Sequence, residues 1–424
     1  MSITDKKIAV IGLGYVGLPL TLAFAKKYST VGFDVNSKRI SELNSGTDIT
    51  KEVHPDELIS TIANSATLEF TDDSNLIQNC DIYIVTVPTP VDQQKLPDLS
   101  HLLEATKMLG TLISPGNIVI YESTVYPGCT ENDCVPLLEI TSGLKYNVDF
   151  FCGYSPERIN PGDRVNTLTT IKKVTSGSTP EIAEMVDQLY ASIIQAGTFK
   201  AKSIKVAEAC KAIENAQRDV NISFVNELAL IFDLMNIDTA DVIEAAQTKW
   251  NFLPFKPGLV GGHCIGVDPY YLAYQAEKLG HKPQVILSGR KVNDNMAIFV
   301  VNKLLKLMVL KNQPIQGAYV LILGLTFKEN CTDIRNSKVF DVYHELKTLG
   351  MHVDVFDPNA NSEQVYKVHN INPISELKTY DAILLTVAHN QFLDLDFNAL
   401  KSNENSIIFD LKSILPRELV DARL

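Results

Sequence analysis

A cysteine in a glycine-rich segment is the residue of this sequence with the most specific chemistry. Cys264 lies in the run PGLVGGHCIGVDP, far downstream of a segment typical of dinucleotide binding. A nicotinamide cofactor and a positioned thiolate together predict two successive oxidations of one substrate, the second on a covalent adduct of the thiol. An alcohol is oxidised to an aldehyde, captured by the thiolate, oxidised again as the thiohemiacetal, and released from the thioester by water as a carboxylate. A buried cysteine is the usual alternative, but the turn-forming surroundings of Cys264 favour exposure to a ligand. His263 is adjacent in sequence, so its side chain need not point the same way, and we leave it out of the mechanism.

The cofactor half of this prediction rests on a glycine-rich turn. An apolar strand pattern is followed directly by GLGYVG, where a strand should turn into a helix. Gly12 would make the tight turn, Gly14 would let the backbone approach a diphosphate, and Gly17 would allow close helix packing. The diphosphate would then bind N–H groups at the helix N-terminus, around Tyr15 and Val16.

An acidic residue follows the second predicted strand. Asp34 comes about 20 residues after the glycines, the spacing of the acid that binds the adenosine ribose hydroxyls. A carboxylate there favours NAD over NADP, whose 2′-phosphate it would repel, although Lys38 and Arg39 nearby weaken this exclusion. We include Arg39 among the expected cofactor residues. Loops at the carboxyl ends of later strands add Pro88, Thr89, Ser123 and Thr124.

The composition fits an intracellular enzyme and disfavours several partners. The chain has 424 residues, of which 45% are hydrophobic, and 50 acidic against 38 basic side chains give a net charge of −12. This balance disfavours nucleic acid and anionic membranes as partners. Seven cysteines without CxxC spacing indicate reduced thiols and no metal site. Three glycines and Pro19 in the uncharged run of residues 8–25 argue against a signal peptide, so we expect a cytoplasmic protein.

The order of the predicted elements indicates an α/β protein of three parts. Alternating strand and helix patterns are followed by a run without Gly or Pro, residues 203–253, which is helical in pattern and largely apolar. Such a helix would pack between domains or against a second copy of the chain, which predicts a homodimer or higher homo-oligomer. We therefore expect two Rossmann-like, doubly wound domains joined by a long central helix, with the parts at 1–200, 201–312 and 313–424.

The third part repeats the strand and turn pattern of the first but lacks its full GxGxxG motif. Its first strand pattern leads into GLTFK, which ends at Lys328, and a later strand ends at Asp357. It should therefore not hold a dinucleotide diphosphate in the same way. Lys328 and Arg335 instead offer positive charge suited to phosphate groups.

These motifs resemble the UDP-glucose/GDP-mannose dehydrogenase family over essentially the full length of the chain. They are GLGYVG at 12–17, ESTV at 122–125, SPER at 155–158, EACK at 208–211 with Asn215, GGHC at 261–264 with DPY at 268–270, and FK at 327–328 with Asp333 and Arg335. Other segments are most similar to the bacterial branch that acts on UDP-N-acetylhexosamines: TKWNFL at 248–253, GVDPYY at 266–271 and GRKVND at 289–294. The resemblance implies oxidation of C6 of UDP-N-acetylglucosamine or UDP-N-acetylgalactosamine to the uronic acid, with two NAD, for capsule or O-antigen synthesis.

The resemblance also implies catalytic roles. Lys211 and Asn215 lie four residues apart on one helix face and would flank the reacting carbon, where they stabilise oxyanion charge. Asp268 would hold a catalytic water or accept protons. The implied catalytic residues are the nucleophile Cys264, the water-ordering Thr124, the base of thioester hydrolysis Glu157, Lys211, Asn215 and Asp268.

For the ligands, the resemblance implies an NAD-binding first part, a central dimerisation part that carries catalytic residues, and a UDP-sugar-binding third part. Arg158 replaces an apolar residue of the UDP-glucose branch, and Lys249 lies near the place of an arginine that the family lends across its dimer interface. The expected substrate residues are Glu157, Arg158, Lys211, Asn215, Lys249, Gly261, Gly262, Arg290, Phe327 and Lys328. The expected cofactor residues are Gly12, Gly14, Tyr15, Val16, Gly17, Asp34, Arg39, Pro88, Thr89, Ser123, Thr124 and Arg335.

Other functions stay open at this point. UDP-N-acetylmannosamine and UDP-glucose are alternative substrates, and no residue identifies the preferred sugar epimer. A two-electron alcohol dehydrogenase that merely carries a thiol would yield one NADH per substrate and be indifferent to Cys264. An inactive regulatory protein on the same fold would bind NAD without turnover.

Overall fold

The computed structural model describes residues 5–50, 52–65, 67–92, 94–157, 167–262 and 265–424. Arg158, His263 and Cys264, which the sequence analysis singled out, lie outside these described residues. The chain divides into two compact units: Met1–Glu214 with Tyr270–His281, and Asn215–Pro269 with Lys282–Leu424. Each unit contains a parallel β-sheet with helices on its faces, which confirms the predicted α/β class with two Rossmann-like domains.

The first unit contains a six-stranded sheet with the order β3-β2-β1-β4-β5-β6. All neighbouring strands are parallel, which requires crossover connections and buries both faces of the sheet. This is the dinucleotide-binding Rossmann order, in which ligands bind at the carboxyl ends of the strands. The strands are β1 Lys7–Ile11, β2 Ser29–Phe33, β3 Leu68–Thr71, β4 Ile82–Val85, β5 Ile118–Tyr121 and β6 Phe151–Tyr154.

The apolar runs of the sequence form these strands because helices cover both sides of the sheet. Ile8 and Val10 of β1 pack with Phe24 in one core cluster, and Leu13 and Leu18 belong to a second cluster. A small parallel pair, β7 Lys173–Thr175 and β8 Thr198–Lys200, packs against helix α6, Pro180–Ala191. The helices are α1 Gly17–Ala25, α2 Ser37–Asn44, α3 Pro55–Asn64, α4 Ser100–Gly110, α5 Val135–Ser142 and α6 Pro180–Ala191.

The second unit contains a five-stranded parallel sheet with the order β10-β9-β11-β12-β13. Along β9, Val320 and Ile322 enter one core cluster, and Leu321 and Leu323 enter another, so this sheet too is buried on both faces. The strands are β9 Tyr319–Leu323, β10 His352–Phe356, β11 Ala382–Leu385, β12 Ile407–Asp410 and β13 Ala422–Arg423. The helices are α8 Thr239–Ala246, α10 Gln284–Leu310, α11 Val339–Thr348 and α12 Ser362–His369.

The two sheets begin with the same hydrogen-bonded turn. Gly12 and Gly324 follow β1 and β9 with φ of +93° and +98°. The hydroxyl of Thr86 donates to the carbonyl oxygens of Ile11 and Gly12, at 3.0 and 2.7 Å. In the second unit, the hydroxyl of Thr386 donates to the carbonyl oxygens of Leu323 and Gly324, at 2.9 and 2.8 Å. The third part therefore echoes the first in atomic detail.

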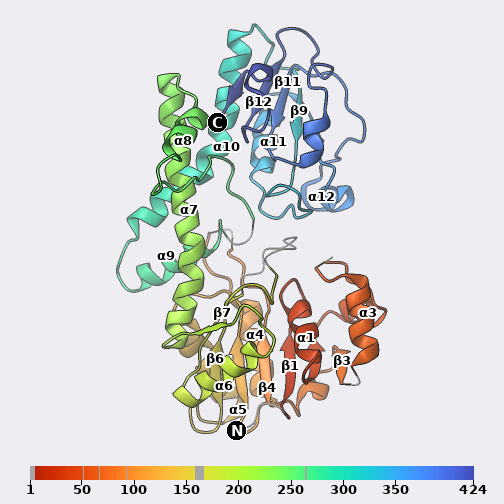
Figure 1. The fold of residues 1–424 in the computed structure, drawn as a ribbon, viewed down its shortest axis with the longest axis vertical. Helices are drawn as coiled ribbons and strands as arrows, with labels where there is room; N and C mark the ends of the chain where they lie inside the picture. The colour runs from red at the N-terminus through yellow and green to blue at the C-terminus, as the bar shows by residue number, and fades with distance from the viewer. Residues whose placement is uncertain (1–4, 51, 66, 93, 158–166, 263–264) are drawn as a thin grey trace. The chain divides into compact units, whose positions relative to one another are not determined.

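The predicted long helix is present but shorter than its sequence pattern. Helix α7, Ile204–Met235, is visible in Figure 1, and α9, Asp268–Lys278, follows later in the chain. The prediction of one continuous helix through residue 253 was wrong, because α7 ends before Asn236, which adopts the left-handed conformation with φ of +54°. The side chain of Asp238 then caps the separate helix α8. Within the described residues, no helix has both the length and the apolar character needed to cross a membrane.

Candidate active site

The turn between β1 and α1 has the shape of a diphosphate cradle. A Cβ atom on Gly17 would lie 1.8 Å from the carbonyl oxygen of Gly12, so only glycine lets the helix approach the turn. Around a Cβ on Gly14, no described atom lies within 4 Å, which leaves room for a ligand against the backbone. Val16, which follows Tyr15, is the N-cap of α1, and no side chain caps the helix there. These features fit the diphosphate of NAD.

Two predicted cofactor residues hold this turn. Asp34 follows β2, and its Oδ2 accepts the N–H of Leu13 at 2.8 Å. Arg39 is buried, donates from Nε to the carbonyl of Leu13 at 2.9 Å, and pairs with Asp48 at 2.9 Å. The structure thus places Arg39 where it supports the turn, with its charge balanced by a carboxylate of the protein.

Alanine at Gly14 and at Gly17 is expected to have different effects. We expect Gly14→Ala to fold normally and to raise the KM for NAD about tenfold, ~1.4 kcal/mol, because the methyl group fills the space left for the ligand. We expect Gly17→Ala to lower the melting temperature, because its methyl group meets the backbone of Gly12. Kinetics and thermal melts of both variants measure this, and a Gly14→Ala protein with unchanged KM would contradict the assignment of the cradle.

The loops after β4 and β5 are tied together beside this turn. Thr89 donates from its hydroxyl to the carbonyl of Thr124 at 2.6 Å, and Ser123 donates to the carbonyl of Val87 at 2.6 Å. The hydroxyl of Tyr271 donates to the carbonyl of Thr89 at 2.7 Å. The predicted cofactor residues of these two loops therefore lie close together, and the neighbouring Pro88 is exposed.

The start of α7 is anchored to the loop that follows Thr124. Glu208 is fully buried, and its carboxylate accepts the backbone N–H groups of Gly128 at 2.5 Å and Thr130 at 2.9 Å. Burial raises the pKa of Glu208, and the two N–H groups act in the opposite direction. This residue fixes the first turn of the helix that carries Lys211.

Two predicted catalytic residues that are far apart in sequence meet in the second unit. Asn215 donates from Nδ2 to Oδ2 of Asp268 at 2.6 Å, and the two residues are 7% and 2% exposed. Lys211 lies one turn before Asn215 on α7 and is 6% exposed. Because the amine of Lys211 and the amide of Asn215 are both buried, this face of α7 is not a solvated charged surface.

Glu157 lies in a buried cluster whose other members were not predicted to contact it. Lys173 Nζ lies 2.6 Å from Oε2 of Glu157 and 2.7 Å from Oε2 of Glu122. The hydroxyl of Tyr190 donates to the other carboxylate oxygen of Glu122. We refer to Lys173, Glu122, Glu157 and Tyr190 as the Lys173 cluster. It brings together residues from β7, from α6 and from the loops after β5 and β6.

Predicted substrate residues also meet in the second unit. Gly262 has φ of +84°, and a Cβ there would lie 2.8 Å from the ring of Phe327. A Cβ on Gly261 would lie 2.7 Å from the carbonyl oxygen of Asn336. Lys328 Nζ lies 5.6 Å from the centroid of the Phe327 ring. The two glycines that precede His263 and Cys264 therefore pack closely against the loop that contains Phe327 and Lys328.

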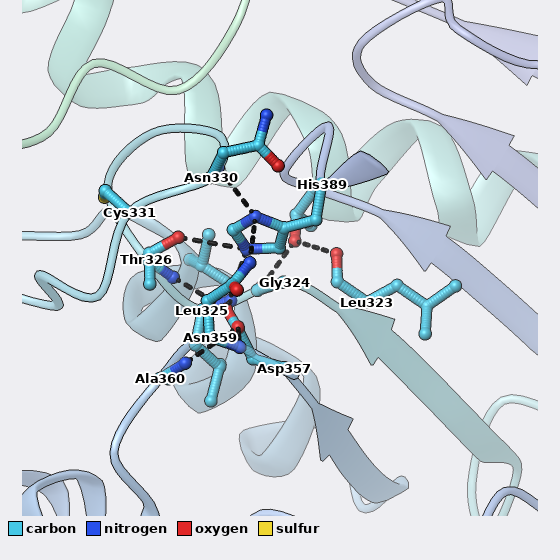
Figure 2. A network of polar contacts seen from close by, with 12 residues as sticks. Leu323, Gly324, Leu325, Thr326, Asn330, Cys331, Asp357, Asn359, Ala360 and His389 are labelled. Carbon is cyan, nitrogen blue, oxygen red and sulfur yellow. Dashed lines mark hydrogen bonds and ion pairs between the residues drawn. The ribbon is translucent and has the colours of Figure 1, made fainter. Parts of the chain in front are cut away.

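That loop is held by a buried network (Figure 2). Asp357, after β10, accepts the N–H groups of Leu325 and Thr326 at 2.5 and 3.1 Å. His389 Nε2 lies 3.1 Å from the same carboxylate oxygen, and its Nδ1 accepts the N–H of Asn330 at 2.9 Å. Asp357 is buried, which raises its pKa, but hydrogen bonds from His389 and the backbone outweigh this and lower it. The network fixes the backbone on both sides of Lys328.

Three cationic residues that were predicted to contact ligands either pair with carboxylates of the protein or lie on its surface. The guanidinium of Arg290 is 3% exposed and lies 2.5 Å from Asp219 and 2.6 Å from Asp294. Arg335 pairs with Asp333 at 2.6 Å. Lys249 is exposed. The predicted contacts of these three residues with ligands, and those of Arg158, stay predictions.

Three consecutive parts of the chain match models of one protein family. They are the NAD binding domain of the UDP-glucose/GDP-mannose dehydrogenase family at residues 6–194, its central domain at 205–295, and its UDP binding domain at 321–417. The chain belongs to this family. It is therefore a nucleotide-sugar dehydrogenase with an NAD-binding domain.

Full-length relatives and solved structures agree with this assignment. The dehydrogenase is 53% identical to a UDP-N-acetyl-D-glucosamine 6-dehydrogenase of Salmonella typhi, covering 100% of this chain and 99% of the relative. It is 50% identical to protein CapL of Staphylococcus aureus, over 97% and 96% of the two chains. A solved UDP-D-ManNAc dehydrogenase from Pyrococcus horikoshii superposes with a TM-score of 0.88 at 30% identity, over 98% of each chain.

Proposed function

We propose that this dehydrogenase oxidises C6 of UDP-N-acetyl-D-glucosamine to the uronic acid in two NAD-dependent steps, for surface polysaccharide synthesis. The substrate is supported by the 53% identity over the whole chain to an enzyme with that name. The mechanism is supported above all by the buried Asn215–Asp268 pair, because Asp268 lies four residues after Cys264 in the sequence. UDP-N-acetylgalactosamine, UDP-N-acetylmannosamine and UDP-glucose are the alternative substrates.

In the proposed mechanism, NAD bound at the turn of Gly14 supplies the hydride acceptor. The thiolate of Cys264 adds to the aldehyde, and Lys211 and Asn215 stabilise the oxyanion. Asp268 exchanges the proton of the reacting oxygen. Thr124 orders the hydrolytic water, and Glu157 removes a proton from it as the thioester is cleaved.

The proposal extends to the remaining ligand contacts and to assembly. Phe327, Lys328 and the glycines beside them bind the UDP-sugar, with Arg158, Lys249 and Arg290 as further contacts, and Arg335 reaches the cofactor. The domain boundaries are those expected above: 1–200, 201–312 and 313–424. Large apolar residues on α7 are exposed in the single chain, and their burial in a homodimer or larger homo-oligomer would remove this surface from water. They include Phe224, Ile231, Leu234 and Met235. The enzyme acts in the cytoplasm.

Counting NADH per sugar tests the proposed function. With excess NAD and limiting UDP-N-acetylglucosamine, we expect two NADH per sugar at completion, because the thiol relay joins two oxidations. One NADH per sugar would indicate a simple alcohol dehydrogenase. Absence of NADH with this sugar but two NADH with another UDP-sugar would correct the substrate and keep the mechanism.

A further inference from the structure

The Lys173 cluster holds two carboxyl groups and one amine away from water. The side chains of Lys173, Glu122 and Glu157 are 3%, 0% and 8% exposed. Solvent screening is weak in such a place, and removing one partner of a buried ion pair leaves an uncompensated charge. The ammonium of Lys173 therefore stabilises both carboxylates.

The two carboxyl groups compete for this ammonium. Burial raises the pKa of Glu122 to about 7, with Lys173 acting against the rise and Glu157 adding to it. Burial lowers the pKa of Lys173, but Glu122 and Glu157 outweigh this and raise it, so the amine stays charged. Among the described residues, the charged or titratable groups that face Glu122 are Lys173, Glu157 and Tyr190. Below about pH 7 Glu122 is protonated and uncharged. Within the Lys173 cluster, the ammonium then forms an ion pair with the carboxylate of Glu157 only.

Given the proposed function, in which Glu157 is the base of thioester hydrolysis, we propose that Lys173 is the positioning residue of Glu157. Glu122 accepts from the ammonium at 2.7 Å, and the ring centroid of Tyr190 lies 5.3 Å from it. The ammonium in turn holds the carboxylate of Glu157 at 2.6 Å. Glu157 then removes a proton from the water whose oxygen bonds to the thioester carbon. The carbon–sulfur bond breaks, the sulfur of Cys264 leaves with the electron pair, and Glu157 returns its proton to solvent.

Replacing Lys173 by methionine separates hydrolysis from oxidation. We expect steady-state turnover of Lys173→Met to fall roughly 100-fold, since a misplaced general base loses much of its effect. Formation of two NADH per site should persist, and the Cys264 thioester should accumulate, which intact-protein mass spectrometry after acid quench detects. Lys173→Arg keeps the charge and should recover part of the turnover.

Lys200 offers a matched control in the neighbouring strand. It pairs with Glu184, and the two side chains are 43% and 49% exposed. Exposed pairs contribute little, so Lys200→Met should keep turnover within about twofold of the wild-type protein and show no thioester.

Glutamine at Glu122 tests the competition without removing the lysine. Because the folded-state pKa of Glu122 lies above its usual 4.5, its contribution to stability is lost as the pH rises through about 7. Glu122→Gln mimics the neutral acid, so we expect it to fold and to melt no lower than the wild-type protein above pH 7. Because Glu122 of the wild-type protein is already neutral below about pH 7, we expect the variant to match the wild-type hydrolysis rate there. Above pH 7, where a charged Glu122 draws on the same ammonium, we expect the variant to hydrolyse the thioester faster than the wild-type protein.

The outcomes separate the two proposals. A wild-type protein that yields no NADH from any UDP-sugar would refute the proposed function. A wild-type yield of two NADH would keep the proposed function. Unchanged turnover in folded Lys173→Met, or equal hydrolysis rates of Glu122→Gln and the wild-type protein above pH 7, would then overturn the positioning role alone. If Lys173→Met does not fold, the Glu122→Gln profile decides.

Discussion

Replacing Cys264 by alanine is expected to lower the rate of uronate formation at least about 1,000-fold, ~4 kcal/mol in the activation free energy. Without the thiolate, the aldehyde is not captured as a thiohemiacetal, and the second oxidation has no covalent substrate. The first oxidation keeps its cofactor and its oxyanion stabilisation, so the variant should yield at most one NADH per sugar. Product analysis by mass spectrometry and NADH absorbance measure the two effects.

Cys210 provides the control for this experiment. It is partly buried on α7, and its thiol lies 3.5 Å from Oε1 of Glu214. Cys210→Ala removes a thiol of the same chain without removing the proposed nucleophile, so we expect two NADH per sugar. Uronate formation at the wild-type rate by Cys264→Ala would remove the thiol relay from the mechanism.

Removal of the Glu208 carboxylate is expected to lower the stability of the first unit strongly. Glu208→Ala leaves the N–H groups of Gly128 and Thr130 buried without their acceptor. Two unsatisfied donors should cost about 3 kcal/mol, which lowers the melting temperature of this unit by roughly 5–10 °C. Scanning calorimetry measures the shift. Glu208→Gln keeps one acceptor but turns an amide N–H₂ toward the other donor, so it should also be destabilised.

Glu104 is an exposed glutamate on α4 of the same unit and serves as the control. Its replacement by alanine should change the free energy of unfolding by no more than about 0.5 kcal/mol. Equal melting temperatures for Glu208→Ala and Glu104→Ala would show that the anchor of α7 contributes nothing to stability.

Helices and strands could be predicted from the sequence where they depend only on residues close together in the chain. The apolar runs and the glycines at Gly12 and Gly324 give the strands and their turns, because both depend on neighbouring residues. The end of α7 was not predictable in this way. Asn236 is compatible with a helix, and its left-handed conformation depends on the structure around it.

Site residues could be predicted where a sequence motif contains them. Ion pairs between residues far apart in the sequence could not be predicted. Asn215 and Asp268 came from their motifs, and the structure joins them. Lys173 looks like its neighbour Lys172, and nothing in the sequence places it against Glu122, 51 residues away. Likewise, Arg290 was expected at a phosphate without knowledge of its pairing with Asp219, 71 residues earlier.

The hydrogen-bonded turn shared by the two sheets is held in the same way in both units. Asp81 accepts the N–H of Lys7 at 2.9 Å, and Asp381 accepts the N–H of Tyr319 at the same distance, so the agreement extends beyond the glycines. The carboxylates of Asp34, after β2, and Asp357, after β10, each accept backbone N–H groups of the turn. Both turns are therefore preorganised by the protein, so binding of a ligand at either one would not carry the entropic cost of ordering the backbone there.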